Sequence, residues 1–197
     1  MRNVVSKTHS PTDYITVSEL RDHLHITSNL DDAYILNLLN GVFDMASNYL
    51  GYQICKSTVD YFFKSGESLH IPARIVGVSS VKYRDSNGDL QTLSATDYDE
   101  VLTISANYGY DVTLINAPSS AYSYGWLYKV TVSEGFERET ATADESKKFP
   151  YALRNAIFLL CEHFYTQRGT TVVGVSAFEL PFGHEYILSP YKIMEFV

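Results

Sequence analysis

Three neighbouring residues could form a nucleophile with its base. Cys161 and His163 flank Glu162, and a thiol beside an imidazole is the arrangement of a thiol hydrolase. These residues fall within a predicted helix, where side chains two positions apart point in different directions. Without a second structural element to bring them together, the thiol and the imidazole cannot form a hydrogen bond with each other. We therefore interpret Cys161 as a core residue and His163 as a residue at its margin.

Two other groups could bind calcium or cleave a glycosidic bond. The segment DSNGDL, residues 85–90, resembles the start of a calcium loop, but Leu90 stands where the turn glycine is needed and Thr96 where a bidentate glutamate is needed. A hairpin turn explains the same residues. Asp97 and Asp99 could serve a hydrolase, although the sequence indicates no carboxylate facing them across a cleft.

The remaining candidates for chemistry are also weak. His23 and His25 diverge on a predicted helix and cannot share a metal ion. Cys55 and Cys161 are the only cysteines and lack metal-ligand spacing, so we expect them to be reduced and buried. The sequence contains no phosphate-binding, dinucleotide-binding, serine-hydrolase or zinc-protease motif. We predict no enzymatic activity, no catalytic residue, no metal site and no cofactor.

Composition limits the class of protein. The 197 residues are 45% hydrophobic, which excludes a disordered chain. The net charge of -8 argues against a protein that grips nucleic acid through its phosphates. No apolar run approaches the length of a membrane span, and the first residues lack the apolar region of a secretory signal. We expect synthesis in the cytoplasm.

A short helix and a long helix are predicted early in the chain. Thr16 and Glu19 have the spacing of a capping box at the start of a helix over residues 17–25. The long helix, 31–50, has Asn29 or Asp31 as candidate cap, and Gly51 ends it. Two apolar rows run along it, so we expect it to contact partners on more than one side. The rows are Leu36, Leu39, Phe43, Ala46, Leu50 and Ile35, Leu38, Val42, Met45, Tyr49.

A third helix is predicted over residues 150–168, with Pro150 as its first residue and Gly169 after its end. Between the helices the apolar period changes to two, as in strands, and it places Val59, Tyr61 and Phe63 on one face of the segment STVDYFF. Asn87 and Gly88 are expected to be the central residues of a hairpin turn, both with positive φ. The strand candidates are STVDYFF, ESLHIP, VSSVKYR, EVLTIS, DVTLIN and WLYKVTV.

These signals predict an α+β fold with a helical core of two long helices and a short N-terminal helix. A small β-domain is inserted into that core, and the chain ends in an extended arm. The expected segments are a polar N-terminal arm at 1–14, the helical core at 15–56 and 148–168, the β-domain at 57–133, a linker at 134–147 and the C-terminal arm at 169–197.

The C-terminal arm is rich in apolar side chains, although chain ends are usually polar. Either these side chains dock on another chain or they pack on the chain's own helices. We predict the first, as a surface for another protein chain. The predicted binding residues are Phe178, Phe182, Tyr186, Ile187, Leu188, Pro190, Tyr191, Lys192, Ile193 and Phe196.

The order of these segments resembles the head–tail connector (adaptor) family of tailed bacteriophages, in its long members with an inserted β-domain. The resemblance covers most of residues 15–196 through four patterns that occur in the same order. Two positions differ, because His25 and Lys192 stand where the family has arginine. The matching residues are Glu19, His23, Leu24, Asp31, Asp32, Ala46 and Gly51; Val78, Val81, Tyr83, Asp85 and Gly88; Pro150, Leu153, Ala156, Ile157, Leu159, Leu160, Tyr165 and Arg168; and Leu188, Pro190 and Tyr191.

The resemblance implies a structural virion protein at the head–tail interface of the capsid vertex, made in the cytoplasm of a bacterial host. Such proteins form an oligomeric ring, usually of twelve identical subunits, beneath the portal protein. They extend the channel for DNA packaging and ejection, bind a tail or stopper protein below, and contact no membrane. The DNA passes without specific binding, and the acidic balance fits a channel wall that repels phosphates.

Two other functions remain open from the residues alone. The tyrosine-rich segments NYGYDV and SSAYSYGWLY suggest a carbohydrate- or receptor-binding β-module of a phage particle, because exposed aromatic rings stack on sugars. A hydrolase that uses Asp97 or Asp99 is the other. Loss of turnover in Asp→Asn variants would distinguish the hydrolase from both binding proteins.

Overall fold

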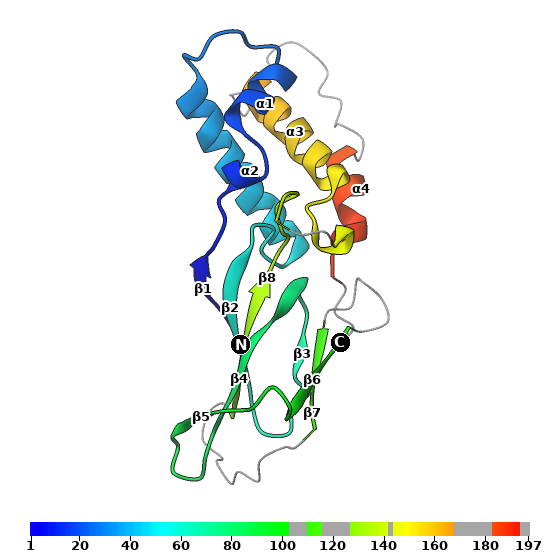
Figure 1. Ribbon diagram of the computed structural model, residues 1–197. Helices are drawn as coiled ribbons and strands as arrows, with labels where there is room; N and C mark the ends of the chain where they lie inside the picture. Colours follow the sequence, from blue (N-terminus) through cyan, green and yellow to red (C-terminus); the bar gives the residue numbers. More distant parts are fainter. Residues whose placement is uncertain (103–109, 116–126, 142–143, 168–182, 194–197) are drawn as a thin grey trace. The chain divides into compact units, whose positions relative to one another are not determined.

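The computed structural model describes residues 1–102, 110–115, 127–141, 144–167 and 183–193 (Figure 1). The chain divides into two compact units. The first, here the β unit, comprises residues 1–9 and 52–137 and resumes at residue 193; the second, the helical unit, comprises residues 10–51 and 138–192. The mixture of helices and strands confirms the predicted α+β class.

The division between the units falls at different residues from those predicted. Residues 52–56 were assigned to the helical core and residues 134–147 to a linker, but 52–56 and 134–137 belong to the β unit. Ile54 and Phe136 are fully buried there, and the Phe136 N–H donates to the Ile54 carbonyl at 3.0 Å. These apolar residues flank the strands at both ends and extend the β core beyond the strand pattern.

The helical unit contains α1 (Val17–His23), α2 (Asp32–Leu50), α3 (Tyr151–Thr166) and α4 (Gly183–Leu188). Its described residues also form the short 3-10 helices η1 (Pro11–Asp13), η2 (Glu145–Lys147) and η3 (Ser189–Tyr191). Figure 1 shows α2 and α3 side by side. No helix in the described part of the chain is long and apolar enough to cross a membrane.

The helix ends follow local signals for the most part. The predicted capping box is confirmed, because the Glu19 N–H donates to Thr16 Oγ1 at 3.2 Å and the Thr16 N–H donates to the Glu19 carboxylate at 2.8 Å. Gly51 ends α2 with φ of 85°. Asp31 precedes α2 but makes no side-chain cap, since its carboxylate accepts the Tyr165 hydroxyl at 2.5 Å.

The two apolar rows predicted on α2 are not both buried. The first row is buried except at Leu36, whereas the second row is buried only at Ile35 and Val42, and Met45 is 39% exposed. The side of α2 that carries Met45 therefore faces solvent. The buried residues of α2 are Ile35, Leu39, Val42, Phe43, Ala46, Ser47 and Leu50, and those of α3 are Leu153, Ala156, Ile157, Leu160 and Cys161.

The described strands of the β unit form two antiparallel sheets. The five-stranded sheet has the order β1-β2-β8-β4-β5, and the three-stranded sheet has the order β3-β7-β6. On β2 the predicted face of Val59, Tyr61 and Phe63 is buried, which confirms the period of two. The strands are β1 (Arg2–Lys7), β2 (Ser57–Phe63), β3 (His70–Ile71), β4 (Ile75–Arg84), β5 (Leu90–Thr92), β6 (Tyr98–Leu102), β7 (Tyr110–Leu114) and β8 (Tyr128–Glu134).

The N-terminal segment, predicted as a polar arm, contains a strand that the sequence analysis did not predict. Residues 2–7 form the edge strand β1, which pairs antiparallel with β2. The Phe62 N–H donates to the Met1 carbonyl at 2.8 Å, and the Arg2 guanidinium forms an ion pair with the buried Glu134. All six strand residues are exposed. A strand that buries neither face does not need alternating apolar residues, and RNVVSK has no such alternation to signal it.

The hairpin between β4 and β5 is confirmed, but its turn differs from the predicted one. Gly88 has φ of 89°, whereas Asn87 does not have positive φ. The Asp85 N–H donates to the Asp89 carbonyl and the Gly88 N–H to the Asp85 carbonyl, both at 3.0 Å. The loop is therefore longer than two residues, and only its last turn position requires a left-handed conformation.

Candidate interaction surface

The C-terminal helix α4 packs against α3 of its own unit (Figure 1). Leu188, the last residue of α4, is only 2% exposed. The Ser189 hydroxyl donates to the Tyr186 carbonyl at 3.0 Å and links α4 to η3. The Lys192 ammonium lies 5.0 Å from the centre of the Tyr49 ring on α2. Residues 183–192 are thus anchored on the chain's own helices.

This packing corrects the prediction of an extended arm over the part of 169–197 that the structure describes. Gly183 to Tyr191 form α4 and η3. Six helical residues between Pro181 and Pro190 are too few to show a helical period, and contacts with α3 stabilise the helix instead. Sequence reasoning therefore missed α4, and the alternative in which the tail packs on its own helices applies to Leu188.

The predicted binding residues have different environments. Tyr186 is 76% exposed. Ile187, Tyr191 and Ile193 are half-buried, while Pro190 and Lys192 are exposed. Phe178, Phe182 and Phe196 lie outside the described residues. The exposed side chains of Tyr186, Pro190 and Lys192 form the part of the predicted surface that another protein can reach, here called the α4 surface.

Substitutions at two α4 residues separate core packing from surface exposure. Leu188→Ala is expected to lower the free energy of unfolding by about 2–3 kcal/mol, because it opens a cavity against α3. Tyr186→Ala is expected to change it by less than about 0.5 kcal/mol, because the ring is exposed. Urea unfolding followed by circular dichroism measures both. Equal stability of the two variants would mean that α4 does not pack on the helical unit in solution.

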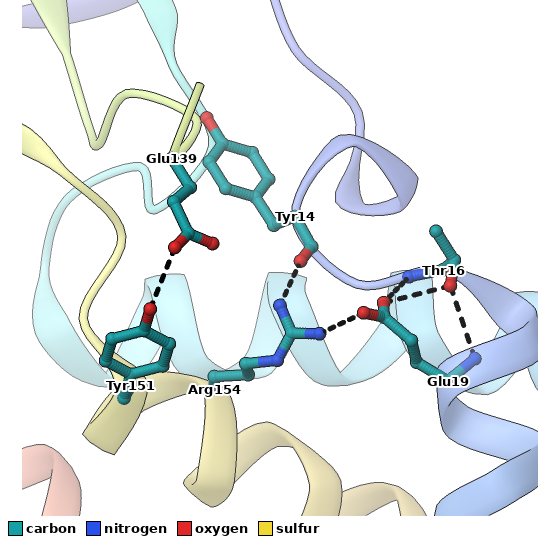
Figure 2. A network of polar contacts seen from close by, with 6 residues as sticks. All are labelled: Tyr14, Thr16, Glu19, Glu139, Tyr151 and Arg154. Carbon is teal, nitrogen blue, oxygen red and sulfur yellow. Dashed lines mark hydrogen bonds and ion pairs between the residues drawn. The ribbon is translucent and has the colours of Figure 1, made fainter. Parts of the chain in front are cut away.

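A polar network around Arg154 ties α3 to the first turn of α1 (Figure 2). Its guanidinium donates to the Tyr14 carbonyl at 2.8 Å and to the Glu19 carboxylate at 2.5 Å. Burial opposes ionisation of Glu19, but the hydrogen bonds from Thr16 and the Arg154 charge together hold the pKa of Glu19 below its ordinary value. Figure 2 also shows the Tyr151 hydroxyl donating to Glu139, at 2.8 Å.

This network positions α1 relative to α3. The Glu19 carboxylate, which the connector resemblance singles out, is occupied by Thr16 and Arg154. It fixes the start of α1 against α3, the helix on which α4 packs. The α4 surface therefore rests on a helix that charged hydrogen bonds hold in place.

The candidate nucleophile has the properties of a core residue. Cys161 is fully buried, and burial raises the pKa of its thiol to about 12. A reactive cysteine requires the opposite shift, toward the thiolate. His23 lies with its Nε2 3.3 Å from Glu162 and its ring stacked on Phe158, with ring centres 4.9 Å apart.

The raised pKa of Cys161 predicts that the free energy of unfolding falls at alkaline pH. The pKa of the thiol is about 12 in the folded chain and about 9 in the unfolded chain. Between these values the unfolded chain loses the thiol proton and the folded chain keeps it, so the free energy of unfolding falls as the pH rises from about 9 toward about 12. The expected slope above pH 9 is about 1.4 kcal/mol per pH unit. Urea unfolding from about pH 8 to about pH 10 measures it. Cys161→Ala is the control, which should have lower stability at neutral pH but a shallower alkaline slope.

The candidate calcium residues lie in a hairpin turn, and of the candidate glycosidase residues Asp97 is half-buried and Asp99 is exposed. The Asp85 carboxylate accepts the N–H groups of Asn87 and Asp89, both at 2.9 Å, as expected of a hairpin turn. Hydrogen bonds from the Gln91 side chain and from these N–H groups lower the pKa of Asp85. Among the described residues no three His, Cys, Asp or Glu side chains could hold a metal ion. Most of the two tyrosine-rich segments lies outside the described residues.

Comparison with known proteins gives matches in structure but not in sequence. No protein-family model and no curated protein matches the chain. Solved structures of gene transfer agent (GTA) particles contain chains of the same fold. One, the neck of an empty GTA particle computed with C6 symmetry, contains a chain 20% identical to this one, with a TM-score of 0.72; the match covers 100% of this chain and 97% of that chain.

Two further GTA structures give the same result. The virion of a native GTA particle contains a chain 19% identical, with a TM-score of 0.71, and the neck of a native GTA particle computed with C12 symmetry contains a chain 20% identical, with a TM-score of 0.68. Each match covers 100% of this chain and 97% of that chain. The chain therefore shares its fold, over its whole length, with chains of phage-like particles.

Proposed function

We propose that this chain is a structural subunit of the neck of a phage-like particle, without enzymatic activity. Twelve copies form a ring beneath the portal protein, extend the DNA channel, and present a surface to a tail or stopper protein. The observation that carries the proposal is the full-length fold match to chains in GTA structures, two of them necks with C6 and C12 symmetry. The independent resemblance of four sequence patterns to the connector family supports the same assignment.

Charge supports the role of a channel wall. Each copy carries a net charge of -8, so twelve copies form a strongly acidic ring. A wall of that sign repels the DNA phosphates, and the duplex slides through without adhering.

The α4 surface is proposed as the portal-binding surface. The exposed residues Tyr186, Pro190 and Lys192 lie close together in sequence, on a segment held to α3. An exposed tyrosine on a rigid support is typical of residues that contribute strongly to binding. Leu188 acts from beneath, by anchoring that segment.

Electron microscopy of the purified chain, alone and mixed with the portal protein from the same genome, tests the proposal. The expected result is a twelve-subunit ring seated on the portal. Tyr186→Ala should weaken that binding at least tenfold, or by about 1.4 kcal/mol. A chain that remains monomeric both alone and with the portal would contradict the ring, and full binding by Tyr186→Ala would contradict the α4 surface.

A further inference from the structure

One face of α2 is exposed along the length of the helix. Asn37, Gly41, Asp44 and Asn48 recur at the spacing that aligns residues on one side of a helix, and all four are exposed. Met45 lies beside them and is 39% exposed. These five residues are here called the Gly41 face.

The glycine in this face has no function within the described part of the chain. Glycine destabilises a helix interior relative to alanine, so it persists where a backbone must come close or φ must be positive. Gly41 does not have positive φ. A β-carbon added to it would meet no atom within 4 Å. Neither the fold of the helix nor its packing in the helical unit requires a glycine here.

The composition of the face indicates what comes close. Asp44 is its only charged residue, in a chain of net charge -8. Two copies of an acidic chain repel each other, so they approach at least cost through a weakly charged surface. Interfaces are depleted in lysine, glutamate and aspartate, and of these the face contains only Asp44. An exposed methionine adapts its shape to a neighbour.

We propose that the Gly41 face receives an element of a second copy of this chain, with Gly41 admitting its close approach. The inference rests on the proposed ring, and it assigns to α2 one side of the contact between adjacent subunits. The ring contact is heterologous, so the surface that enters the Gly41 face belongs to a different part of the neighbouring copy.

The test uses a substitution that should stabilise the isolated chain but weaken its self-association. Gly41→Ala should raise the melting temperature of the isolated chain by roughly 2–4 °C, because alanine favours the helix and meets no clash. The same substitution should weaken self-association, and Gly41→Leu should weaken it at least tenfold. Sedimentation velocity from about 1 µM to about 500 µM, alone and with the portal protein, measures association. Gly77→Ala on β4, where an added β-carbon also meets open space, is the matched control.

The outcomes separate this inference from the function on which it rests. If the wild-type chain associates and Gly41→Leu associates equally well, the Gly41 face is not a subunit contact, while the ring remains supported. If the wild-type chain does not associate under either condition, both the ring and the contact are wrong. A drop in association for the Gly77→Ala control equal to that for Gly41→Ala would also overturn the assignment to α2.

Discussion

Glu134→Ala is expected to lower the free energy of unfolding by about 3–5 kcal/mol, a large part of the 5–15 kcal/mol that is typical of a folded domain. The Glu134 side chain is fully buried. It accepts hydrogen bonds from the Arg2 guanidinium, the Gln53 N–H and, at 2.9 Å, the Tyr61 hydroxyl. Removing the carboxylate leaves all three donors without their acceptor, and β1 loses its anchor.

Variants of Arg2 and Glu134 distinguish the cost of leaving one charge unpaired from the cost of removing both charges. Arg2→Met alone should also destabilise the chain, because it leaves the buried carboxylate without its cation. The double variant Arg2→Met with Glu134→Leu should recover part of the loss, since no charge is then buried unpaired. Arg138→Ala is the control, because its ion pair with Asp13, at 3.2 Å, is exposed and is worth less than about 1 kcal/mol.

Urea unfolding of these variants, with hydrogen exchange of the β1 and β2 amides, provides the measurement. Rapid exchange of β1 amides alone, with unchanged global stability, would show that Glu134 anchors only the edge strand. A Glu134→Ala variant as stable as Arg138→Ala, with protected β1 amides, would contradict the ion pair between Arg2 and the buried Glu134.

Gly135→Ala is expected to destabilise the chain by about 3 kcal/mol or more, because a backbone clash adds to conformational strain. Gly135 has φ of 108°. An added β-carbon would lie 2.8 Å from the Ile54 carbonyl oxygen and 2.9 Å from the Cys55 carbonyl carbon. These are backbone atoms, which cannot rotate away as the end of a side chain can. The Gly135 N–H also donates to the Arg74 carbonyl at 2.9 Å, which holds the residue in place.

Gly66→Ala is the matched control for this prediction. Gly66 has φ of 81°, but an added β-carbon meets no atom within 4 Å. Its substitution therefore measures the strain of positive φ alone, about 1 kcal/mol. Thermal and urea unfolding of both variants measure their losses of stability. The loss for Gly135→Ala minus that for Gly66→Ala is the cost of the clash with the Ile54 and Cys55 backbone. Equal losses for the two variants would mean that the chain relaxes around Gly135.

Local interactions are what the sequence by itself determined. The Thr16–Glu19 capping box, the left-handed Gly51 and the alternating face of Val59, Tyr61 and Phe63 all formed as predicted. Each depends on residues at most four positions apart along the chain or on a strict period, so one segment contains the whole signal. The α+β class and the position of the hairpin between β4 and β5 were predictable for the same reason, although the conformation of Asn87 in its turn was not.

Contacts between distant segments are what only the tertiary structure decided. β1 is a strand because β2, more than fifty residues away, supplies its hydrogen bonds and Glu134 binds Arg2. α4 is a helix because α3 packs against it, although its six residues are too few to nucleate a helix alone. Leu188 and Tyr186 look alike as apolar tail residues, yet one is buried and the other exposed. No local pattern distinguishes them, because burial depends on which surface the folded chain places against each side chain.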